Sequence, residues 1–477
     1  MWTIGMAETM SQIKCSELKD GYNLLVNSAG DYVFIRDENL DRLGKNMLTD
    51  YELSWLEYAG FLNSNSVDFF KNSLEFKSDL RNLAPRTLSY ILIIPTLRCN
   101  LSCSYCQVSR ANENAQGYDW TDEIIDQFMA YVSAYASDDV KIEFQGGEPT
   151  LRMDIVEEIV IRTKNLKPNA TFVICTNLSN LSQALLKLIR RKDFFISSSL
   201  DGPPEVHKSH RTLNNKVTSN FFGNLDLILE EFGTEKISLL PTIVDYKRIN
   251  ETIDFFYEKK LPEIFLRPVN YQGFARKKFL DVAQDADNWS QTYEQAIQYI
   301  AEKNLASSHQ LIETNLSIHL NRIFRQRSHS YVDFRNPNLL GQDYIVVDFD
   351  GKIYPTDESR MLSRIGLIDL SIGDLETGID NEKCSILNSK SSNHDDPICN
   401  LCSYQSFCGV DTIDNISRYG TVDIPTNETY FCKTHLNTFD FIFSKLSSRD
   451  NAFLKLASLC LTGKYAYSSI FGGHHFD

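Results

Sequence analysis

Residues 89–106 read SYILIIPTLRCNLSCSYC, a short apolar run followed at once by cysteines at positions 99, 103 and 106. The β-branched content of the run predicts a buried strand over 89–95, with Cys99, Cys103 and Cys106 on the loop that follows it. Three thiolates on one loop can surround a single inorganic centre. A structural zinc site uses four closed ligands, whereas a 4Fe–4S cluster held by three thiolates leaves one iron open. The spacing therefore favours an iron–sulfur cluster over zinc or incidental thiols.

Downstream of this stretch, β-branched or aromatic runs alternate with segments of helical period, which is the pattern of repeated βα units. Further strands are predicted over 140–144, 171–175, 195–200, 237–243 and 263–269. Helices are predicted between them, including 121–135, capped by Thr121, and 153–164. Because crossovers are right-handed, six such units predict an α/β fold, a partial (β/α)6 TIM-like barrel over 89–335, with functional loops at the carboxyl ends of its strands.

The segments outside the barrel predict smaller domains. Residues 1–88 form a small N-terminal α+β domain, with a hairpin, YNLLVNSAGDYVFIR, turning at 27–30, and helices within 39–43 and 50–62. Residues 336–445 open with a hairpin, YIVVDFDGKIYP, turning at 350–351, and continue as a loop-rich, cysteine-rich domain. A C-terminal helix and tail take 446–477, where SSIFGGHHFD is expected to be a frayed end rather than a metal site.

A second group of cysteines lies in the run CNLCSYQSFC and just beyond it: Cys399, Cys402, Cys408 and Cys432. Four thiolates make a closed site, and spacing alone leaves structural zinc and a fully ligated iron–sulfur cluster both open. Cys384 is either a spare thiol or a weak ligand. The isolated cysteines are expected to be buried or idle thiols: Cys15, Cys175 and Cys460.

Composition narrows the class of protein. The chain has 477 residues and 42% hydrophobic content, enough for two or three domains. Its 48 Lys and Arg face 63 Asp and Glu, a net charge of −15 that argues against nucleic acid as a partner. No run approaches the ~20 apolar residues of a membrane span, and the start does not read as a signal peptide. We expect a soluble cytoplasmic protein without a membrane partner, whose eleven cysteines stay reduced.

The CxxxCxxC spacing, with Tyr105 before the last cysteine, resembles the signature of the radical SAM superfamily. In that family the open iron is chelated by the amino and carboxylate groups of S-adenosyl-L-methionine (SAM). An electron from the cluster then breaks a carbon–sulfur bond, giving methionine and a 5′-deoxyadenosyl radical. The resemblance implies that this radical removes a hydrogen atom from a substrate.

Further motifs of that family close the next strands, and the resemblance implies that they bind the cofactor. Two glycines there let backbone approach the methionine moiety. The implied cofactor-binding residues are Tyr105, Gln145, Gly146, Gly147, Glu148, Thr176, Asn177, Ser199, Asp201 and Arg211. Arg211 sits where relatives bind the SAM carboxylate, but a surface salt bridge is an equally open reading of this residue.

The cysteine-rich segment resembles the SPASM extension of radical SAM peptide maturases, which implies one auxiliary 4Fe–4S cluster on the four cysteines of the second group. Thr356 and Thr412 stand where the fuller pattern has cysteines, so a further cluster is not expected. Asp357 matches an acid thought to act as a base in anaerobic sulfatase maturases, and Glu358 is a second candidate. A turn or cap role for Asp357 stays equally open.

The segments CQVSR, YPTDESR and CGVD look most like the His-Xaa-Ser system radical SAM maturases. This resemblance implies a ribosomally made precursor peptide as substrate, a crosslink as product, and a reduced flavodoxin or ferredoxin-type electron donor. The N-terminal domain is a candidate to bind a leader segment as an added strand. The alternatives are formylglycine formation of the sulfatase-maturase kind and a non-catalytic iron–sulfur protein that transfers electrons.

Overall fold

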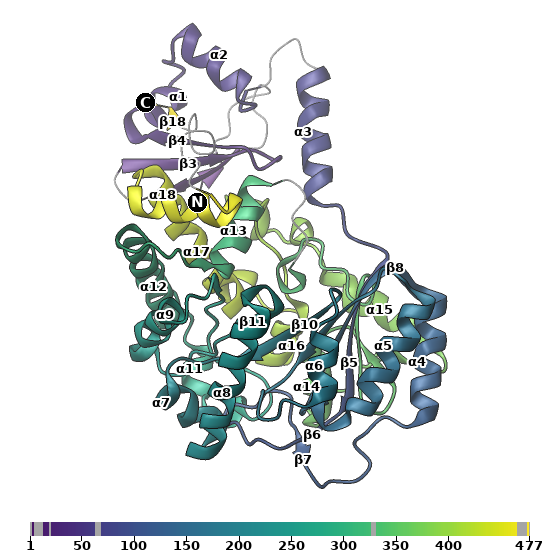
Figure 1. Cartoon of the computed structure of the whole chain (residues 1–477). Coiled ribbons are helices and arrows are strands. Elements are labelled where there is room, and N and C mark those ends of the chain that lie inside the picture. The colour runs from purple at the N-terminus through teal and green to yellow at the C-terminus, as the bar shows by residue number, and fades with distance from the viewer. Residues whose placement is uncertain are drawn as a thin grey trace.

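A nine-stranded sheet in the order β11-β10-β9-β8-β5-β14-β15-β16-β17 forms the centre of the described chain (Figure 1). The computed structural model describes residues 2–3, 13–18, 21–62, 68–325, 331–464 and 475–476. Five parallel strands carry the predicted barrel: β5 (Leu88–Thr96), β8 (Ala136–Gly146), β9 (Thr171–Cys175), β10 (Phe194–Ser199) and β11 (Ile237–Leu240).

Helices follow these strands along the chain and cover the outer face of the sheet (Figure 1). They are α4 (Asp122–Tyr135), α5 (Met153–Leu166), α6 (Gln183–Ile189), α7 (Pro204–His207), α8 (Asn215–Phe232) and α9 (Ile249–Glu258). Thr121 caps α4 as predicted, because its side chain accepts a hydrogen bond from the Ile124 amide. The predicted α/β partial barrel is therefore confirmed.

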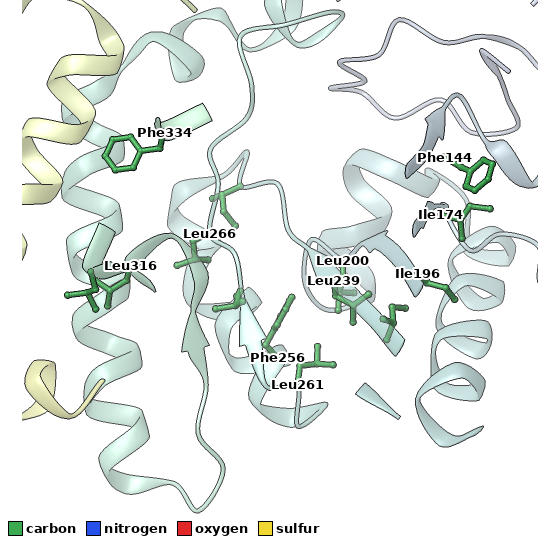
Figure 2. Packing of buried hydrophobic residues seen from close by; sticks show 14 of the residues in the cluster. Phe144, Ile174, Ile196, Leu200, Leu239, Phe256, Leu261, Leu266, Leu316 and Phe334 are labelled. Carbon is green, nitrogen blue, oxygen red and sulfur yellow. The ribbon is translucent and has the colours of Figure 1, made fainter. Parts of the chain in front are cut away.

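Buried side chains from neighbouring strands form rows across the sheet (Figure 2). Phe144 of β8 lies beside Ile174 of β9, and Ile174 lies beside Ile196 of β10. All three are at most 1% exposed. Because every second residue of a strand faces the same side, these rows bury one whole face of the sheet under the helices.

The sixth predicted strand, 263–269, is mostly wrong. Only β12 (Glu263–Ile264) is a strand, and it pairs with β13 (Ile312–Glu313) in a separate two-stranded sheet. Beyond β12, the chain runs beside the residues that follow β11. Two backbone hydrogen bonds join them: the Ile243 amide donates to Arg267 O, and the Val269 amide donates to Ile243 O. Pro241 and Pro268 lack the amide hydrogen that a continuous ladder needs, which explains why both predicted strands are shortened.

The hairpin predicted around 350–351 is confirmed as β14 (Tyr344–Val347) and β15 (Lys352–Tyr354), which are antiparallel. β14 also pairs in parallel with β5, so the cysteine-rich segment shares a sheet with the first barrel strand. Two short strands, β16 (Gly373–Asp374) and β17 (Gly378–Ile379), complete the edge. The helices that follow in this segment, before α17 (Tyr430–Ser447), are α14 (Asp357–Arg364), α15 (Asn381–Leu387) and α16 (Thr412–Tyr419).

A second sheet, in the order β1-β2-β3-β4-β18, lies at one end of the molecule (Figure 1). Its strands are β1 (Trp2–Thr3), β2 (Lys14–Glu17), β3 (Tyr22–Val26), β4 (Tyr32–Arg36) and β18 (His475–Phe476). Helices α1 (Asp37–Gly44), α2 (Asp50–Tyr58) and α3 (Asp68–Arg81) follow β4. The predicted hairpin over β3 and β4 is confirmed, with the Gly30 amide bonded to Asn27 O.

The expected frayed end is wrong for two residues, because His475 and Phe476 form β18 against β4. Phe476 is 6% exposed, and this burial holds the strand in place. Residues 468–474 and 477 of that prediction lie outside the described residues.

The remaining α-helices that the structure describes follow β11 and the cysteine-rich segment along the chain: α10 (Ala275–Lys278), α11 (Leu280–Gln284), α12 (Ala286–Ala306), α13 (Thr314–Phe324), α17 (Tyr430–Ser447) and α18 (Asn451–Thr462). α12 packs against α17 and α18 (Figure 1). The boundary predicted between residues 445 and 446 falls inside α17, which is one continuous helix there. Across the described ranges, no helix has both the length and the apolar content to cross a membrane.

Candidate functional site

A cavity of about 450 Å³ opens at the carboxyl ends of the barrel strands. Side chains from the loops after β5, β8, β9, β10 and β11 line it, and α17 contributes the opposite wall. The predicted site residues that line it are Cys99, Cys103, Tyr105, Cys106, Gln145, Gly146, Gly147, Thr176, Asn177, Ser199, Arg211 and Glu358. The other predicted site residues are not part of this lining. They are Glu148, Asp201 and Asp357, and the second cysteine group, Cys399, Cys402, Cys408 and Cys432.

The three thiols of the first loop share the cavity wall. Cys99 Sγ accepts a hydrogen bond from the Leu101 amide at 3.4 Å, and the Cys106 amide donates to Cys103 O at 3.2 Å. Burial raises the pKa of Cys99 to about 12 and also raises the pKa of Cys103. A bound cationic centre would release these protons, which is the ordinary behaviour of ligating cysteines. Three thiols on one loop therefore fit the donor set of an open cluster, although no three His, Cys, Asp or Glu side chains among the described residues converge on a single metal-ion position.

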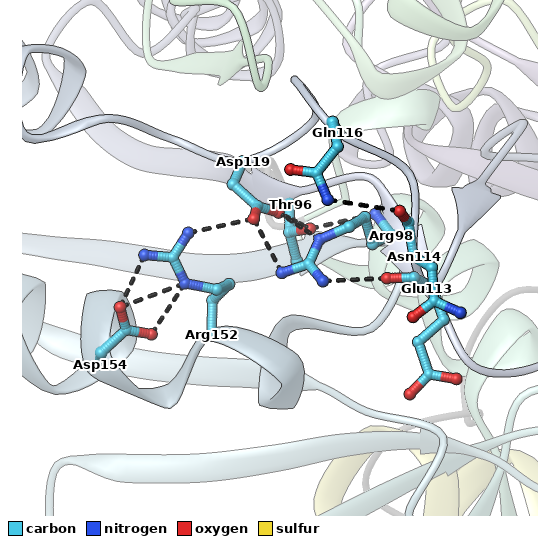
Figure 3. Close-up of polar contacts among 8 residues, drawn as sticks. All are labelled: Thr96, Arg98, Glu113, Asn114, Gln116, Asp119, Arg152 and Asp154. Carbon is cyan, nitrogen blue, oxygen red and sulfur yellow. Dashed lines mark hydrogen bonds and ion pairs between the residues drawn. The ribbon is translucent and has the colours of Figure 1, made fainter.

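Ion pairs outside the cavity fix the start of this loop (Figure 3). Arg98, the residue before Cys99, donates from Nε to Asp119 Oδ1 at 2.8 Å and from Nη1 to Glu113 O at 2.9 Å. Arg152 pairs with the other Asp119 oxygen at 3.2 Å. Asp119 therefore ties the cysteine loop to the turn that follows β8.

The two predicted glycines hold the end of β8 against the same loop. The Gly147 amide donates to Thr96 O at 3.0 Å, and the Glu148 amide donates to Arg98 O at 2.8 Å. A Cβ on Gly147 would lie 2.2 Å from Arg98 O, and one on Gly146, whose φ is +123°, would lie 2.3 Å from Thr96 O. Backbone approaches backbone here, so the close contact that needs glycine is made with the cysteine loop.

Glu148 lies beneath the cavity and links two strand ends. It is 1% exposed, and its carboxylate accepts from Thr150 Oγ1 at 2.6 Å, from Thr176 Oγ1 at 2.7 Å and from the Asn177 amide at 2.8 Å. Burial raises the pKa of Glu148, while these hydrogen bonds oppose that shift. Asn177 Nδ2 in turn donates to Asn100 Oδ1 at 2.9 Å, next to Cys99. The carboxylate therefore orients residues that do line the cavity.

Arg211, Asp201 and Tyr105 form one buried group. Arg211 Nε lies 3.2 and 3.1 Å from the two Asp201 oxygens, and the guanidinium stands over the Tyr105 ring at 5.0 Å. The Tyr105 hydroxyl also donates to Asp201. The Arg211 side chain is 15% exposed and lines the cavity, which separates it from an ordinary surface ion pair.

The two candidate acids after β15 face different surroundings. Asp357 accepts from Arg360 Nε at 2.9 Å, and Arg360 is fully buried and also pairs with Asp348 at 3.6 Å. Glu358 lines the cavity. Thr356 caps α14, since its side chain accepts from the Ser359 amide. The structure thus places Glu358, and not Asp357, at the cavity wall.

The second cysteine group lies apart from the cavity lining. Burial, and then the charges of Cys402, Cys432 and Cys399, raise the pKa of Cys408, so the four thiols lie within electrostatic reach of one another. Lys14 of β2 is 7% exposed beside them and donates to Gln405. Burial lowers the pKa of Lys14, while the Cys402 and Cys399 thiols oppose that shift. Cys384 is buried in the apolar core, against Gly341 and Ile372.

Several cavity residues were not predicted. Cys175, expected to be idle, lines the cavity and donates from Sγ to Glu143 at 3.2 Å. His435 lines the α17 side, with its Nδ1 3.0 Å from His319 Nε2. The guanidinium carbon of Arg418 lies 3.7 Å from the centroid of the Tyr430 ring. Cys175 could have been predicted as a cavity residue from its position at the end of a predicted strand. No local sequence pattern indicated that residues of α16 and α17 would line the cavity.

Comparison with known proteins identifies the central unit. Residues 93–256 match the Radical SAM superfamily. The chain carries a radical SAM domain. It is 26% identical over 196 residues to a cysteine-type anaerobic sulfatase-maturating enzyme of Clostridium perfringens, covering 38% of this chain and 51% of that protein. It is 27% identical over 218 residues to a GTP 3′,8-cyclase of Limosilactobacillus fermentum, covering 44% and 59%. The chain spans about half the length of the curated relatives it matches.

A solved structure extends the likeness in fold. The native anSMEcpe structure with bound AdoMet superposes with a TM-score of 0.59 at 18% identity, covering 76% of this chain and 99% of that one. A further structure of that protein holds AdoMet and a peptide named Cp18Cys, with a TM-score of 0.58. At this identity the likeness concerns the fold alone.

Proposed function

We propose that the protein is a radical SAM peptide maturase that acts on a ribosomally made precursor peptide, closest in kind to the His-Xaa-Ser system maturases. The observation that carries the proposal is the gathering of Cys99, Cys103 and Cys106 on one wall of the cavity at the carboxyl ends of the barrel strands. The match of residues 93–256 to the Radical SAM superfamily supports it. So does the likeness in fold to a sulfatase maturase whose structure holds a peptide.

The first three cysteines would hold a 4Fe–4S cluster, which with bound SAM supplies a 5′-deoxyadenosyl radical that removes hydrogen from the peptide. Arg211 is held by Asp201 through its Nε, so its terminal nitrogens are the atoms assigned to the SAM carboxylate. Gly146 and Gly147 keep the cysteine loop against the end of β8. Glu148 fixes Thr176 and Asn177 from below.

Of the two candidate acids, we assign proton acceptance from the substrate to Glu358. It lines the cavity, whereas Asp357 is not among the residues that line it. A carboxylate at the cavity wall can take the proton released when a substrate radical is oxidised. His435 on the facing wall, bonded to His319, would orient the peptide rather than exchange protons.

The second cysteine group would hold one auxiliary 4Fe–4S cluster, giving two clusters in total. The charges of Cys402, Cys432 and Cys399 act on Cys408. Lys14 and Arg322, whose Nη2 donates to Cys408 O at 3.1 Å, lie near these thiols together with the acids Asp396 and Asp440. The two cations offset part of the negative charge that thiolates would add here. A reduced flavodoxin or ferredoxin-type protein is the proposed donor.

Formation of a crosslink is the proposed outcome. Formylglycine formation is the second candidate, because sequence and fold both resemble a sulfatase maturase. Thr356 and Thr412 stand at the positions of the additional cysteines and favour the first candidate.

The test is anaerobic reconstitution with iron and sulfide, followed by iron analysis and a dithionite-driven assay of 5′-deoxyadenosine from SAM. We expect about eight irons per chain with activity, and about four without activity after replacing Cys99, Cys103 and Cys106 by alanine. Cys384→Ala, which changes a thiol in the apolar core, should keep both values. A fully loaded protein that yields no 5′-deoxyadenosine would support an electron-transfer protein instead.

A further inference from the structure

Four arginines line the cavity, although the chain as a whole carries a net charge of −15. Two of them, Arg211 and Arg418, already pair with aspartates. The other two, Arg110 and Arg267, have no ion pair among the residues that the structure describes. A guanidinium that is partly withdrawn from water without an anion is costly, so we expect a bound ligand to supply an anion here.

Arg267 is the less engaged of these two arginines. It is half-buried, and its guanidinium carbon lies 4.9 Å from the centroid of the Phe265 ring, which also lines the cavity. This contact uses none of the five N–H donors of the guanidinium in a conventional hydrogen bond. No oxygen within the described ranges accepts a hydrogen bond from them either. Arg110, by contrast, donates from Nη2 to Ser102 Oγ at 2.8 Å. Arg267 therefore keeps all of its N–H donors for a ligand.

The backbone that carries Arg267 is held from two sides. The amide of the preceding residue, Leu266, donates to the buried carboxylate of Glu313 at 3.0 Å. The Arg267 carbonyl accepts from the Ile243 amide at 2.9 Å, at the end of the chain that follows β11. A side chain on a fixed backbone loses little conformational freedom when it binds, which favours both affinity and selectivity.

The anion for Arg267 must come from the substrate, because the proposed function already assigns the SAM carboxylate to Arg211. A peptide carries carboxylates on its Asp and Glu side chains and at its C-terminus. We propose that Arg267 is a specificity-determining residue that binds a carboxylate of the substrate peptide inside the cavity, a step that rests on the proposed function. The planar fork of its guanidinium matches the two oxygens of such a group.

The test uses the anaerobically reconstituted protein with saturating SAM and three defined probes. They are acetyl-Gly-Glu-Gly-amide, acetyl-Gly-Gln-Gly-amide, and acetyl-Gly-Gln-Gly with a free C-terminal carboxylate. Saturating SAM keeps the probes from the site of its own carboxylate. Calorimetric titration measures the Kd of each probe. We expect an acidic probe to bind at least tenfold more tightly than the neutral one, and the acidic probe that does so distinguishes a side-chain carboxylate from a C-terminal one.

Arg267→Gln should remove this preference, so that all three probes bind with similar affinity. Arg364→Gln is the matched control, because Arg364 also stands over an aromatic ring, that of Tyr118 at 5.1 Å, but lies outside the cavity lining. It should keep the wild-type preference. If Arg267→Gln does not fold, Arg267→Lys serves in its place. It retains a charge and loses the planar fork, and should bind the preferred acidic probe at least threefold more weakly than the wild type.

Equal affinity of the wild type for the three probes would overturn the proposal, as would the absence of measurable binding of any of them. So would a preference that survives Arg267→Gln. A tenfold loss of SAM affinity in that variant would assign the guanidinium to the cofactor instead. Formation of 5′-deoxyadenosine by the wild type without peptide is measured separately. Its absence would count against the proposed function, whereas a missing preference among the probes counts only against this site.

Discussion

Replacing Gly147 by alanine tests whether the glycine pair seats the cysteine loop. The new Cβ would lie 2.2 Å from Arg98 O and 2.4 Å from Leu97 O, both of them backbone atoms of the loop that leads to Cys99. Real Cβ atoms essentially never come within 3.0 Å of such atoms, so the loop must retreat by roughly 1 Å. The φ of Gly147 is not in the left-handed region, so the perturbation is steric alone.

The cost follows from the contacts that this retreat strains. Overpacking of this kind costs about 1–3 kcal/mol. The hydrogen bonds from the Gly147 and Glu148 amides to Thr96 O and Arg98 O would lengthen, at about 1 kcal/mol each. We therefore expect a loss of about 3–5 kcal/mol in the stability of the barrel unit. Displacement of Cys99 should also lower the iron content from about eight to about four per chain, since the second cysteine group is untouched.

The assay combines urea unfolding, followed by tryptophan fluorescence, with iron analysis after anaerobic reconstitution. Gly223→Ala is the matched control, because Gly223 lies within α8 and its added Cβ meets nothing within 4 Å. That control should gain about 0.5–1 kcal/mol from the better helix propensity of alanine. A Gly147→Ala protein with wild-type iron content and wild-type unfolding would refute the steric argument.

Two further predictions concern buried charges. Burial raises the pKa of Glu313 from 4.5 to about 7, so the folded chain holds a proton that the unfolded chain has released between these values. Stability should therefore fall by about 3 kcal/mol as the pH rises from about 4.5 to 7. Urea unfolding at several pH values checks this, and an equally steep fall in Glu313→Gln would contradict it. Arg360→Ala would leave the carboxylates of Asp357 and Asp348 without their buried cation, at about 3–5 kcal/mol. Thermal unfolding measures the loss, and an Asp357→Asn variant that loses as much would argue against this cause.

The parts of the fold that the sequence predicted are those whose signal is local. β5, β9 and β10 coincide with short β-branched or aromatic runs, and their observed bounds lie within one residue of the predicted ones. β8 was also predicted, but it extends beyond the predicted 140–144 at both ends. The prediction of the sixth strand was wrong because it relied on an apolar run and did not take account of the prolines in it. The pairing of β14 with β5 could not be predicted from local sequence, since it joins segments about 250 residues apart. β18 is two residues long, too short for any periodicity to appear.

The candidate site divides in the same way. Cys99, Cys103 and Cys106 lie within eight residues of sequence, so their common loop was predictable. The wall formed by α17 was not, because the position of His435 depends on how that helix packs across the barrel. Glu358 was only a second candidate, since sequence cannot tell which of two adjacent carboxylates a neighbouring arginine such as Arg360 will engage.

Contacts between the N-terminal sheet and the second cysteine group bear on how a bound peptide would be presented. Ser16 of β2 donates to Ser403 at 2.8 Å, and Lys14 of the same strand donates to Gln405. Arg81 at the end of α3 donates to Arg322 O at 2.7 Å. The bonds of β2 fix the sheet against the run that carries Cys402 and Cys408, and the Arg81 bond fixes α3 against α13, so the N-terminal unit is not expected to swing as a free domain. A leader segment added to this sheet as a strand would then start from a fixed point relative to the cavity. The number of residues between the leader segment and the modified position would therefore be limited by the reach of an extended chain, about 3.3–3.6 Å per residue.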